Sequence, residues 1–169
     1  MHLETLISLL ASNADSIKAL LENLSQRQAQ FKPDKDSWSM LEVINHLCDE
    51  EKEDFRRRLR SLLQEPDQPL PSIKPEAWVM ERNYNQRDLK DSVRLFLKER
   101  QKSIHWLESL TSPDWDSKYS TDSFSIRAGD IMSSWAAHDH LHIRQLIEIW
   151  RQLLVQISSP YKIDYGGRW

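Results

Sequence analysis

The chain has 169 residues, of which 39% are hydrophobic and 29% are charged, and its net charge is -3. This length supports one domain with a real core and is too short for two comfortable ones, so we expect a single domain over residues 1–169. Charges of both signs are interspersed, which argues against nucleic acid as a partner, and no apolar run approaches the ~20 residues of a membrane span.

Cysteine and glycine usage narrows the class of protein further. The single cysteine, Cys48, excludes an intrachain disulfide and a multi-cysteine zinc site, and we interpret it as a small buried hydrophobe. Three glycines are too few for an all-β fold full of tight turns or for a phosphate loop. The first residues lack the basic region and cleavage site of a signal peptide, so we expect a cytoplasmic protein.

The first 24 residues predict an amphipathic helix. Apolar residues recur there in steps of four and three, and polar residues fill the other faces, which is typical of a helix buried on one side. The stripe consists of Leu3, Ile7, Leu10, Ala14, Ile17, Leu21 and Leu24. A polar loop over residues 25–37 follows.

A second helix is predicted to start at Ser39. Ser39 and Glu42 have the spacing of a capping box, and Trp38 and Val43 stand at the positions of a hydrophobic staple. The apolar stripe then runs through Met40, Ile44, Leu47, Phe55, Leu59 and Leu62. His46 lies on the flank of this stripe that faces inward.

Residues 64–87 contain four prolines and cannot form a continuous helix. Extended at ~3.3 Å per residue, they can run the length of a 24-residue helix that rises ~1.5 Å per residue. The segment can therefore connect two helices that point in the same direction. We expect its Trp78, Val79 and Met80 to pack against the bundle.

Two more helices complete the prediction. A third begins near Asp88 and runs to about residue 110, with Arg100 interrupting its apolar stripe at an inward-facing position and His105 at an edge or surface position. After a loop without useful strand-like alternation, a fourth runs from about Ala128 to Leu154. The aromatic tail, residues 160–169, is expected to lie over the bundle as an ordered arm. We therefore predict an all-α fold, a four-helix bundle with a long crossover between helices 2 and 3.

The fourth helix carries histidines on its inward seam. Steps of four and three connect Ile131, Trp135, His138, His142, Gln145 and Ile149, so two histidines and a glutamine stand where a bundle places leucine. Residues four apart lie on one face and can bind one metal ion together. His140 is about 200° around the helix from either histidine and should point elsewhere. The His-x-x-x-His pair alone also fits ordinary surface or hydrogen-bonded histidines.

His46 of the second helix is the candidate third ligand. Three neutral imidazoles leave the fourth position of a divalent ion open, which is typical of a catalytic site. Ligating histidines usually donate their other ring N–H to an acceptor, for which Asp49, Glu50 and Gln145 are candidates. The alternatives are solvated charges for the two carboxylates and a satisfied core amide for Gln145.

In these motifs the chain resembles the DinB superfamily. The matching segments are Trp38–Leu47 (WSMLEVINHL), His138–Leu146 (HDHLHIRQL) and the aromatic tail near Asp164 and Tyr165. The resemblance implies an up-down-down-up bundle and one divalent metal ion, zinc or nickel, held by His46, His138 and His142. Many relatives carry a histidine directly before the last ligand, where this chain has Leu141.

The resemblance also implies metal-dependent chemistry on a small-molecule substrate, and a possible homodimer. The first hypothesis is a thiol S-transferase in which the metal activates a low-molecular-weight thiol for attack on a small electrophile. Arg100 and Arg144 are then candidates to contact a carboxylate of the thiol, unless they are merely solvated. The second is a hydrolase that uses metal-bound hydroxide, with Glu50 as its base. The third is a non-catalytic bundle that binds a metal or a small ligand.

Overall fold

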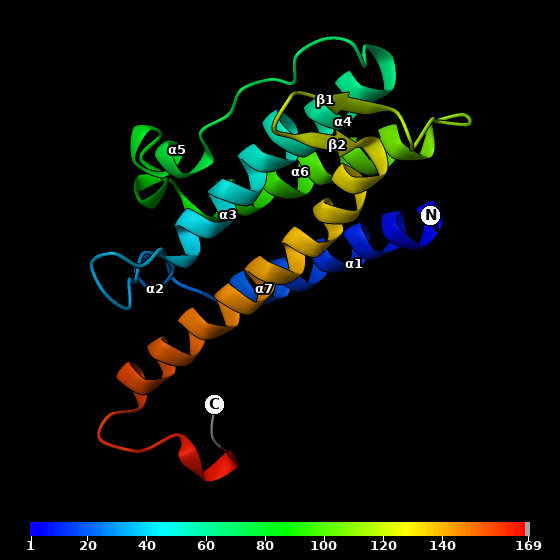
Figure 1. Ribbon diagram of the computed structural model, residues 1–169. Helices are drawn as coiled ribbons and strands as arrows, with labels where there is room; N and C mark the ends of the chain where they lie inside the picture. The colour runs from blue at the N-terminus through cyan, green and yellow to red at the C-terminus, as the bar shows by residue number, and fades with distance from the viewer. Residues whose placement is uncertain (168–169) are drawn as a thin grey trace.

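The computed structural model describes residues 1–167 and is an up-down-down-up four-helix bundle (Figure 1). α1 and α7 run in one direction, and the second and third long helices run in the opposite one. The long helices are α1 (Leu3–Leu21), the second helix built from α3 (Met40–Asp49), η1 (Glu50–Phe55) and α4 (Arg56–Gln64), then α6 (Leu89–Glu108) and α7 (Ala128–Ser158). The predicted fold class is confirmed.

The capping box predicted at the start of the second helix is present. Ser39 Oγ accepts a hydrogen bond from the backbone N–H of Glu42 at 3.1 Å, and the Glu42 carboxylate accepts one from the backbone N–H of Ser39 at 2.8 Å. Every residue of α3 is buried. α3 is therefore the central helix of this end of the bundle, and His46 reaches the interior from it.

One turn of the second helix is wider than an α-helical turn. Residues Glu50–Phe55 form a π-helix between α3 and α4. No feature of the sequence predicted it, because the apolar stripe continues through this segment. π-helical turns are rare and frequently occur at functional sites.

The crossover between α4 and α6 is partly helical. It contains α5 (Pro75–Glu81) and the 3-10 turn η2 (Tyr84–Gln86). Trp78, Val79 and Tyr84 are buried as a small apolar cluster, but Met80 is 74% exposed. The expectation for Met80 was therefore wrong, since α5 presents only one side to the bundle.

Four further short elements were not predicted. α2 (Gln26–Ala29) lies inside the first loop, and η3 (Asp164–Gly166) lies in the tail. Strands β1 (Lys118–Ser120) and β2 (Ser125–Arg127) form an antiparallel hairpin just before α7. In the part of the chain that the structure covers, no helix is both long and apolar enough to cross a membrane.

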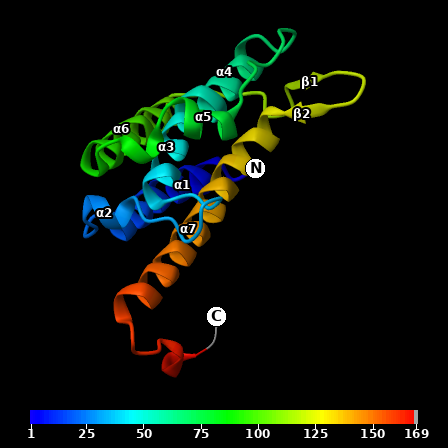
Figure 2. The same ribbon diagram turned by 90° about the vertical axis from the view of Figure 1, so that its left-hand side faces the viewer.

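The tail differs from its prediction. Tyr161 and Tyr165 are highly exposed, and residues 160–167 extend away from the bundle beyond the end of α7 (Figure 2). The described part of the predicted arm over residues 160–169 therefore does not cover the bundle; residues 168–169 lie outside the described part.

A buried polar layer divides the core into two apolar clusters. One cluster is centred on α3 and includes Ile17, Leu21, Ile44, Phe96 and Leu146, and the other includes Leu10, Phe55, Leu59, Leu107 and Trp135. Along each long helix, buried polar residues stand between the members of the two clusters: Asn13, Glu51, Arg100, Asp139 and His142. The candidate site lies at this level of the bundle.

Candidate metal centre

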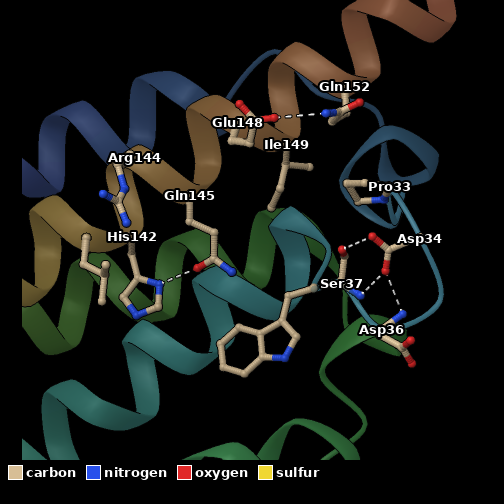
Figure 3. Close-up of a pocket in the computed structure, with 12 residues that line it drawn as sticks. Pro33, Asp34, Asp36, Ser37, His142, Arg144, Gln145, Glu148, Ile149 and Gln152 are labelled. Carbon is tan, nitrogen blue, oxygen red and sulfur yellow. Dashed lines mark hydrogen bonds between the residues drawn. The ribbon is translucent and has the colours of Figure 1, made fainter. Parts of the chain in front are cut away.

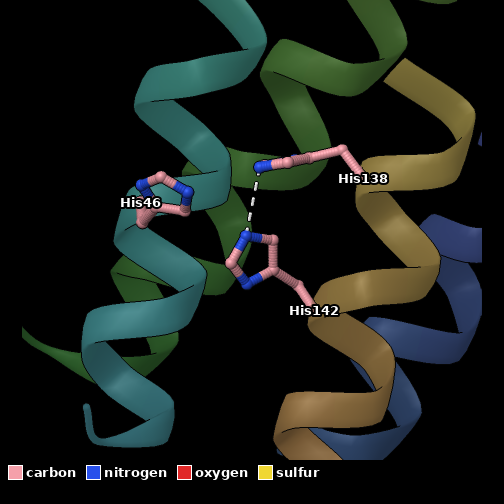
Figure 4. Close-up of side chains that lie close together, drawn as sticks. All are labelled: His46, His138 and His142. Carbon is pink, nitrogen blue, oxygen red and sulfur yellow. Dashed lines mark hydrogen bonds between the residues drawn. The ribbon is translucent and has the colours of Figure 1, made fainter. Parts of the chain in front are cut away.

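Three histidines from two helices converge in the polar layer. Figure 4 shows His46 on α3 facing His138 and His142, which lie one turn apart on α7. One ring nitrogen from each lies within 4.8 Å of the others, and the Nε2 atoms of His138 and His142 are 3.1 Å apart. The three predicted ligands are thus brought together, although His46 is about ninety residues from the other two.

The hydrogen bonds suit a metal site. The Nδ1–H of His142 donates to Gln145 Oε1 at 2.7 Å, which leaves the Nε2 lone pair of His142 directed at the other histidines. His46 Nδ1 is buried and has no hydrogen-bond partner among the described residues. Two nitrogen ligands at ~2.0–2.1 Å from a tetrahedral zinc ion lie about 3.3 Å apart, close to the 3.1 Å separation of the α7 pair.

Burial favours the neutral form of all three imidazoles. It lowers the pKa of His46 to about 3, and the charges of His142 and His138 act in the same direction. The pKa of His138 is also lowered to about 3, by burial and then by His142 and Arg100. Burial lowers the pKa of His142 as well, although its hydrogen bond with Gln145 opposes the shift. Neutral imidazole is the form that binds metal ions.

Two aromatic rings surround the histidines. The ring of Trp38 lies 4.9 Å from that of His46 and is parallel to that of His142 at 6.4 Å. The ring of Phe55 lies 5.1 Å from that of His138. Sequence reasoning treated Trp38 as part of a helix cap and Phe55 as ordinary core, and it connected neither with the site.

A cavity of about 890 Å³ opens beside His142 (Figure 3). Its size is that of a small-molecule binding pocket. Its wall comes from the loop before α3 and from α7: Pro33, Asp34, Asp36, Ser37, Trp38, Leu141, His142, Arg144, Gln145, Glu148, Ile149 and Gln152. A ligand in this cavity would therefore contact one of the three histidines directly.

Asp49 was predicted to support a ligating histidine, but its carboxylate contacts other groups. It accepts hydrogen bonds from Arg82 Nη1 at 2.6 Å and from the Tyr84 hydroxyl at 2.7 Å, and it lies 3.0 Å from Lys52 Nζ. Burial opposes ionisation, yet these contacts keep the pKa of Asp49 below its ordinary value. The carboxylate connects the second helix to the crossover and makes no hydrogen bond with His46 Nδ1.

Glu50 also makes no contact with His46 Nδ1. Burial raises the pKa of Glu50 to about 8, with a further contribution from the charge of Asp54. At neutral pH this raised pKa favours the protonated form of Glu50. This protonation state is that of an acid and does not suit the general base of the hydrolase hypothesis.

The two arginines considered as substrate contacts have different surroundings. Arg100 is only 2% exposed and bonds to Asp139, so it fits neither alternative: it is not solvated and it is not free to contact a substrate. Arg144 is exposed and lines the cavity. His105 and His140 are exposed, in agreement with their predicted positions.

Sequence reasoning missed Asp139. In the sequence it lies between His138 and His142. It is fully buried, and both of its carboxylate oxygens accept hydrogen bonds from Arg100. A signal was available, since a second seam with steps of three and four follows the buried side of α7 more closely: Met132, Trp135, Asp139, His142, Leu146, Ile149 and Leu153.

Comparison with known proteins agrees with this fold. YfiT from Bacillus subtilis, named as a probable metal-dependent hydrolase with an unusual four-helix bundle topology, has a TM-score of 0.78 at 18% identity, over 89% of this chain and 87% of that one. The mycothiol-dependent maleylpyruvate isomerase has a TM-score of 0.69 at 12% identity, over 93% of this chain and 70% of that one. No curated protein sequence matches the chain. The model of the DinB superfamily matches residues 9–146, and the chain therefore belongs to the DinB superfamily.

Proposed function

We propose that this protein is a metal-dependent enzyme in which His46, His138 and His142 hold one divalent ion, zinc or nickel. The observation that carries the proposal is the convergence of three imidazoles, two buried and that of His138 half-buried, all with lowered pKa values, beside a cavity of small-molecule size. Three protein ligands leave a position for water or substrate, which distinguishes catalytic from structural zinc sites.

For the reaction, we propose transfer of a low-molecular-weight thiol to a small electrophile. A divalent ion in this site would bind the thiol as its thiolate, the nucleophilic form. The chain's own residues would orient the reactants: Gln145 fixes the ring of His142, Trp38 forms an apolar wall, and Arg144 is available to a carboxylate of the thiol. The fold shared with a mycothiol-dependent isomerase supports thiol chemistry.

The second candidate is hydrolysis, and the name of YfiT favours it. The protonated state of Glu50 weighs against the base proposed for that reaction. A non-catalytic bundle that binds a metal or a small ligand is the third candidate.

Metal analysis tests the centre first. Protein purified without a polyhistidine tag is expected to contain about one divalent ion per chain, and His138→Ala is expected to lose it. His140→Ala, which changes an exposed histidine on the same helix, is the matched control and should retain the ion. A wild-type protein that cannot be loaded with zinc or nickel at neutral pH would contradict the proposal.

Turnover assays then separate the candidate reactions. Incubation with a model electrophile and a panel of low-molecular-weight thiols should give a thioether product that depends on both thiol and metal. Metal-dependent turnover without thiol would favour the hydrolase, and no turnover with a loaded site would favour the binding bundle.

The homodimer implied by the family stays a prediction. The last turns of α7 expose Leu154, Val155 and Ile157, which is compatible with a contact between copies. Sedimentation of the protein at micromolar concentration measures the oligomeric state directly.

A further inference from the structure

Three almost fully buried charges, Glu51, Arg100 and Asp139, lie near the histidines and have no role in the proposed chemistry. Arg100 of α6 donates to both carboxylate oxygens of Asp139 on α7, at 2.6 and 2.8 Å, and to the backbone oxygen of Leu10 on α1 at 2.8 Å. Its Nη2 also lies 2.9 Å from Glu51 Oε2 on the π-helix. One guanidinium therefore bonds to each of the other three helices of the bundle.

Two further side chains belong to this group, which we call the Arg100 cluster: Asn13, Glu51, Arg100, Trp135 and Asp139. Asn13 donates to Asp139 at 3.2 Å, and the indole N–H of Trp135 donates to Glu51 at 3.0 Å. Arg100, Glu51 and Asp139 are 2%, 1% and 0% exposed.

Stability of the fold alone does not account for such a cluster. Taking charges out of water is costly, and replacement of a buried ion triad by apolar residues of similar volume is often neutral or even stabilising. A buried ionic cluster is better suited to fixing how elements meet, because charged hydrogen bonds require particular distances and directions.

The cluster is connected to the histidines through α7. Asp139 directly follows His138 and precedes His142 by three residues. Its hydrogen bonds therefore fix how this turn of α7 is rotated about the helix axis and where it lies along that axis. Trp135 stacks on Phe55 with ring centroids 5.5 Å apart, and Phe55 contacts the ring of His138. A shift of α7 that broke these bonds would also move two of the three imidazoles away from His46.

The π-helix provides the opposite side of this arrangement. In an uninterrupted α-helix, at ~100° per residue, Phe55 would point about 180° away from His46. One wide turn holds one additional residue, which reduces the difference to about 80°. His46 and Phe55 can therefore both contact His138, while Glu51 reaches Arg100 and Trp135.

We propose that Glu51, Arg100 and Asp139 are positioning residues, which hold α7 against the π-helix in the one register that brings His138 and His142 to His46. This inference rests on the proposed metal site. Its prediction is that neutral, nearly isosteric changes in the cluster weaken metal binding while the protein stays folded.

The test measures the zinc affinity of folded Asp139→Asn and Glu51→Gln by competition with a chromophoric chelator. We expect affinity to fall about 10- to 100-fold, the usual effect of losing a group that orients the ligands. The visible absorption of the cobalt-substituted protein should change in band position or intensity, because it reports the arrangement of the ligands around the ion.

Glu99→Gln is the matched control. Glu99 bonds to Arg56 at 2.6 Å and to Lys102 at 2.6 Å, so its buried ion pair also joins α6 to the second helix, but it has no bond to α7 among the described residues. This variant is expected to keep wild-type zinc affinity and the wild-type cobalt spectrum. An equal loss in the control would mean that any buried charge in this interface matters, and would overturn the proposal.

The remaining outcomes separate failure of the positioning role from failure of the metal site itself. Wild-type affinity and an unchanged cobalt spectrum in both cluster variants would overturn the positioning role while leaving the metal site intact. A wild-type protein that binds no metal would instead remove the proposed function itself. If Asp139→Asn does not fold, Trp135→Phe serves in its place. It removes the N–H donated to Glu51 together with part of the indole ring, and it retains an aromatic ring next to Phe55. It should weaken zinc binding by a smaller factor, and wild-type affinity would count against the proposal.

Discussion

At the scale of single residues, the site depends on hydrogen bonds that fix which ring nitrogen carries a proton. His142 donates its Nδ1–H to Gln145, so its Nε2 lone pair faces His138. His142 and Gln145 are three residues apart on one helix, so the contact between them is predictable from the sequence. That no described residue partners His46 Nδ1 was not predictable, because it depends on the direction in which the Asp49 and Glu50 side chains point.

Replacement of Gln145 by leucine should therefore weaken metal binding without unfolding the protein. His142 would lose the acceptor that orients its ring, and we expect zinc affinity to fall about 10- to 100-fold. Chelator competition measures it. Gln152→Leu changes a similar side chain of the same cavity that bonds to Glu148 and not to a histidine. Equal affinities for the two variants would contradict the orienting role.

Glu50 gives the protein a pH dependence of stability. Its pKa is raised from an ordinary 4.5 to about 8, so between these values the folded state holds more protons than the unfolded state. Stability then falls as pH rises, with a slope of at most about 1.4 kcal/mol per pH unit for one proton. Glu50→Gln removes this titration.

Urea unfolding of the wild type and of Glu50→Gln at pH 5 to 8 is the measurement. The difference in free energy of unfolding should move in favour of the variant as pH rises. A difference that stays constant over this range would show that Glu50 does not hold a proton in the folded state.

At the scale of elements, the entry into the second helix fixes where His46 points. The Ser39 hydroxyl accepts from Glu42 and donates to Asn85 at 2.7 Å, which connects the start of α3 to the end of the crossover. Glu42 also pairs with Lys32 at 2.8 Å. The cap can be predicted from the sequence because its residues are local. Its hydrogen bond to Asn85 could not be predicted, because it depends on how the crossover packs against the start of α3.

We expect Ser39→Ala to lower the free energy of unfolding by about 2 kcal/mol, the upper end for loss of an N-cap, because the hydroxyl is buried. Ser25→Ala is the comparison, since Ser25 caps α2 with the same box in an exposed position and should cost less, about 0.5–1 kcal/mol. Denaturant unfolding measures the free energy of unfolding of both variants. Equal losses would mean that burial of Ser39 and its hydrogen bond to Asn85 add nothing to the stability that the cap provides.

At the scale of the whole molecule, the three proposed metal ligands come from two helices that are distant in sequence and adjacent in the bundle. An ion bound by the folded chain and not by the unfolded chain stabilises the fold by mass action. At a free concentration 1,000 times its Kd, the gain is about 4 kcal/mol.

For a chain of this size, that gain corresponds to a rise of Tm of about 10 °C. Thermal unfolding with zinc and with a chelator measures it, and His138→Ala should have the same Tm in both. A wild-type Tm that does not respond to zinc would indicate that the histidines do not share an ion.

The sequence by itself determined the four helices, the crossover and the pair of His138 and His142, because each depends on local spacing: apolar steps of three and four, prolines and a His-x-x-x-His pair. Only the tertiary structure decided that His46, His138 and His142 meet. It also decided that Arg100 pairs with Asp139 inside the bundle and that the π-helix turns the side chain of Phe55 toward His138. The physical reason is that burial and ion pairing depend on which helices pack together and in which register. The apolar pattern of one helix does not show which charged residues of a neighbouring helix it will meet.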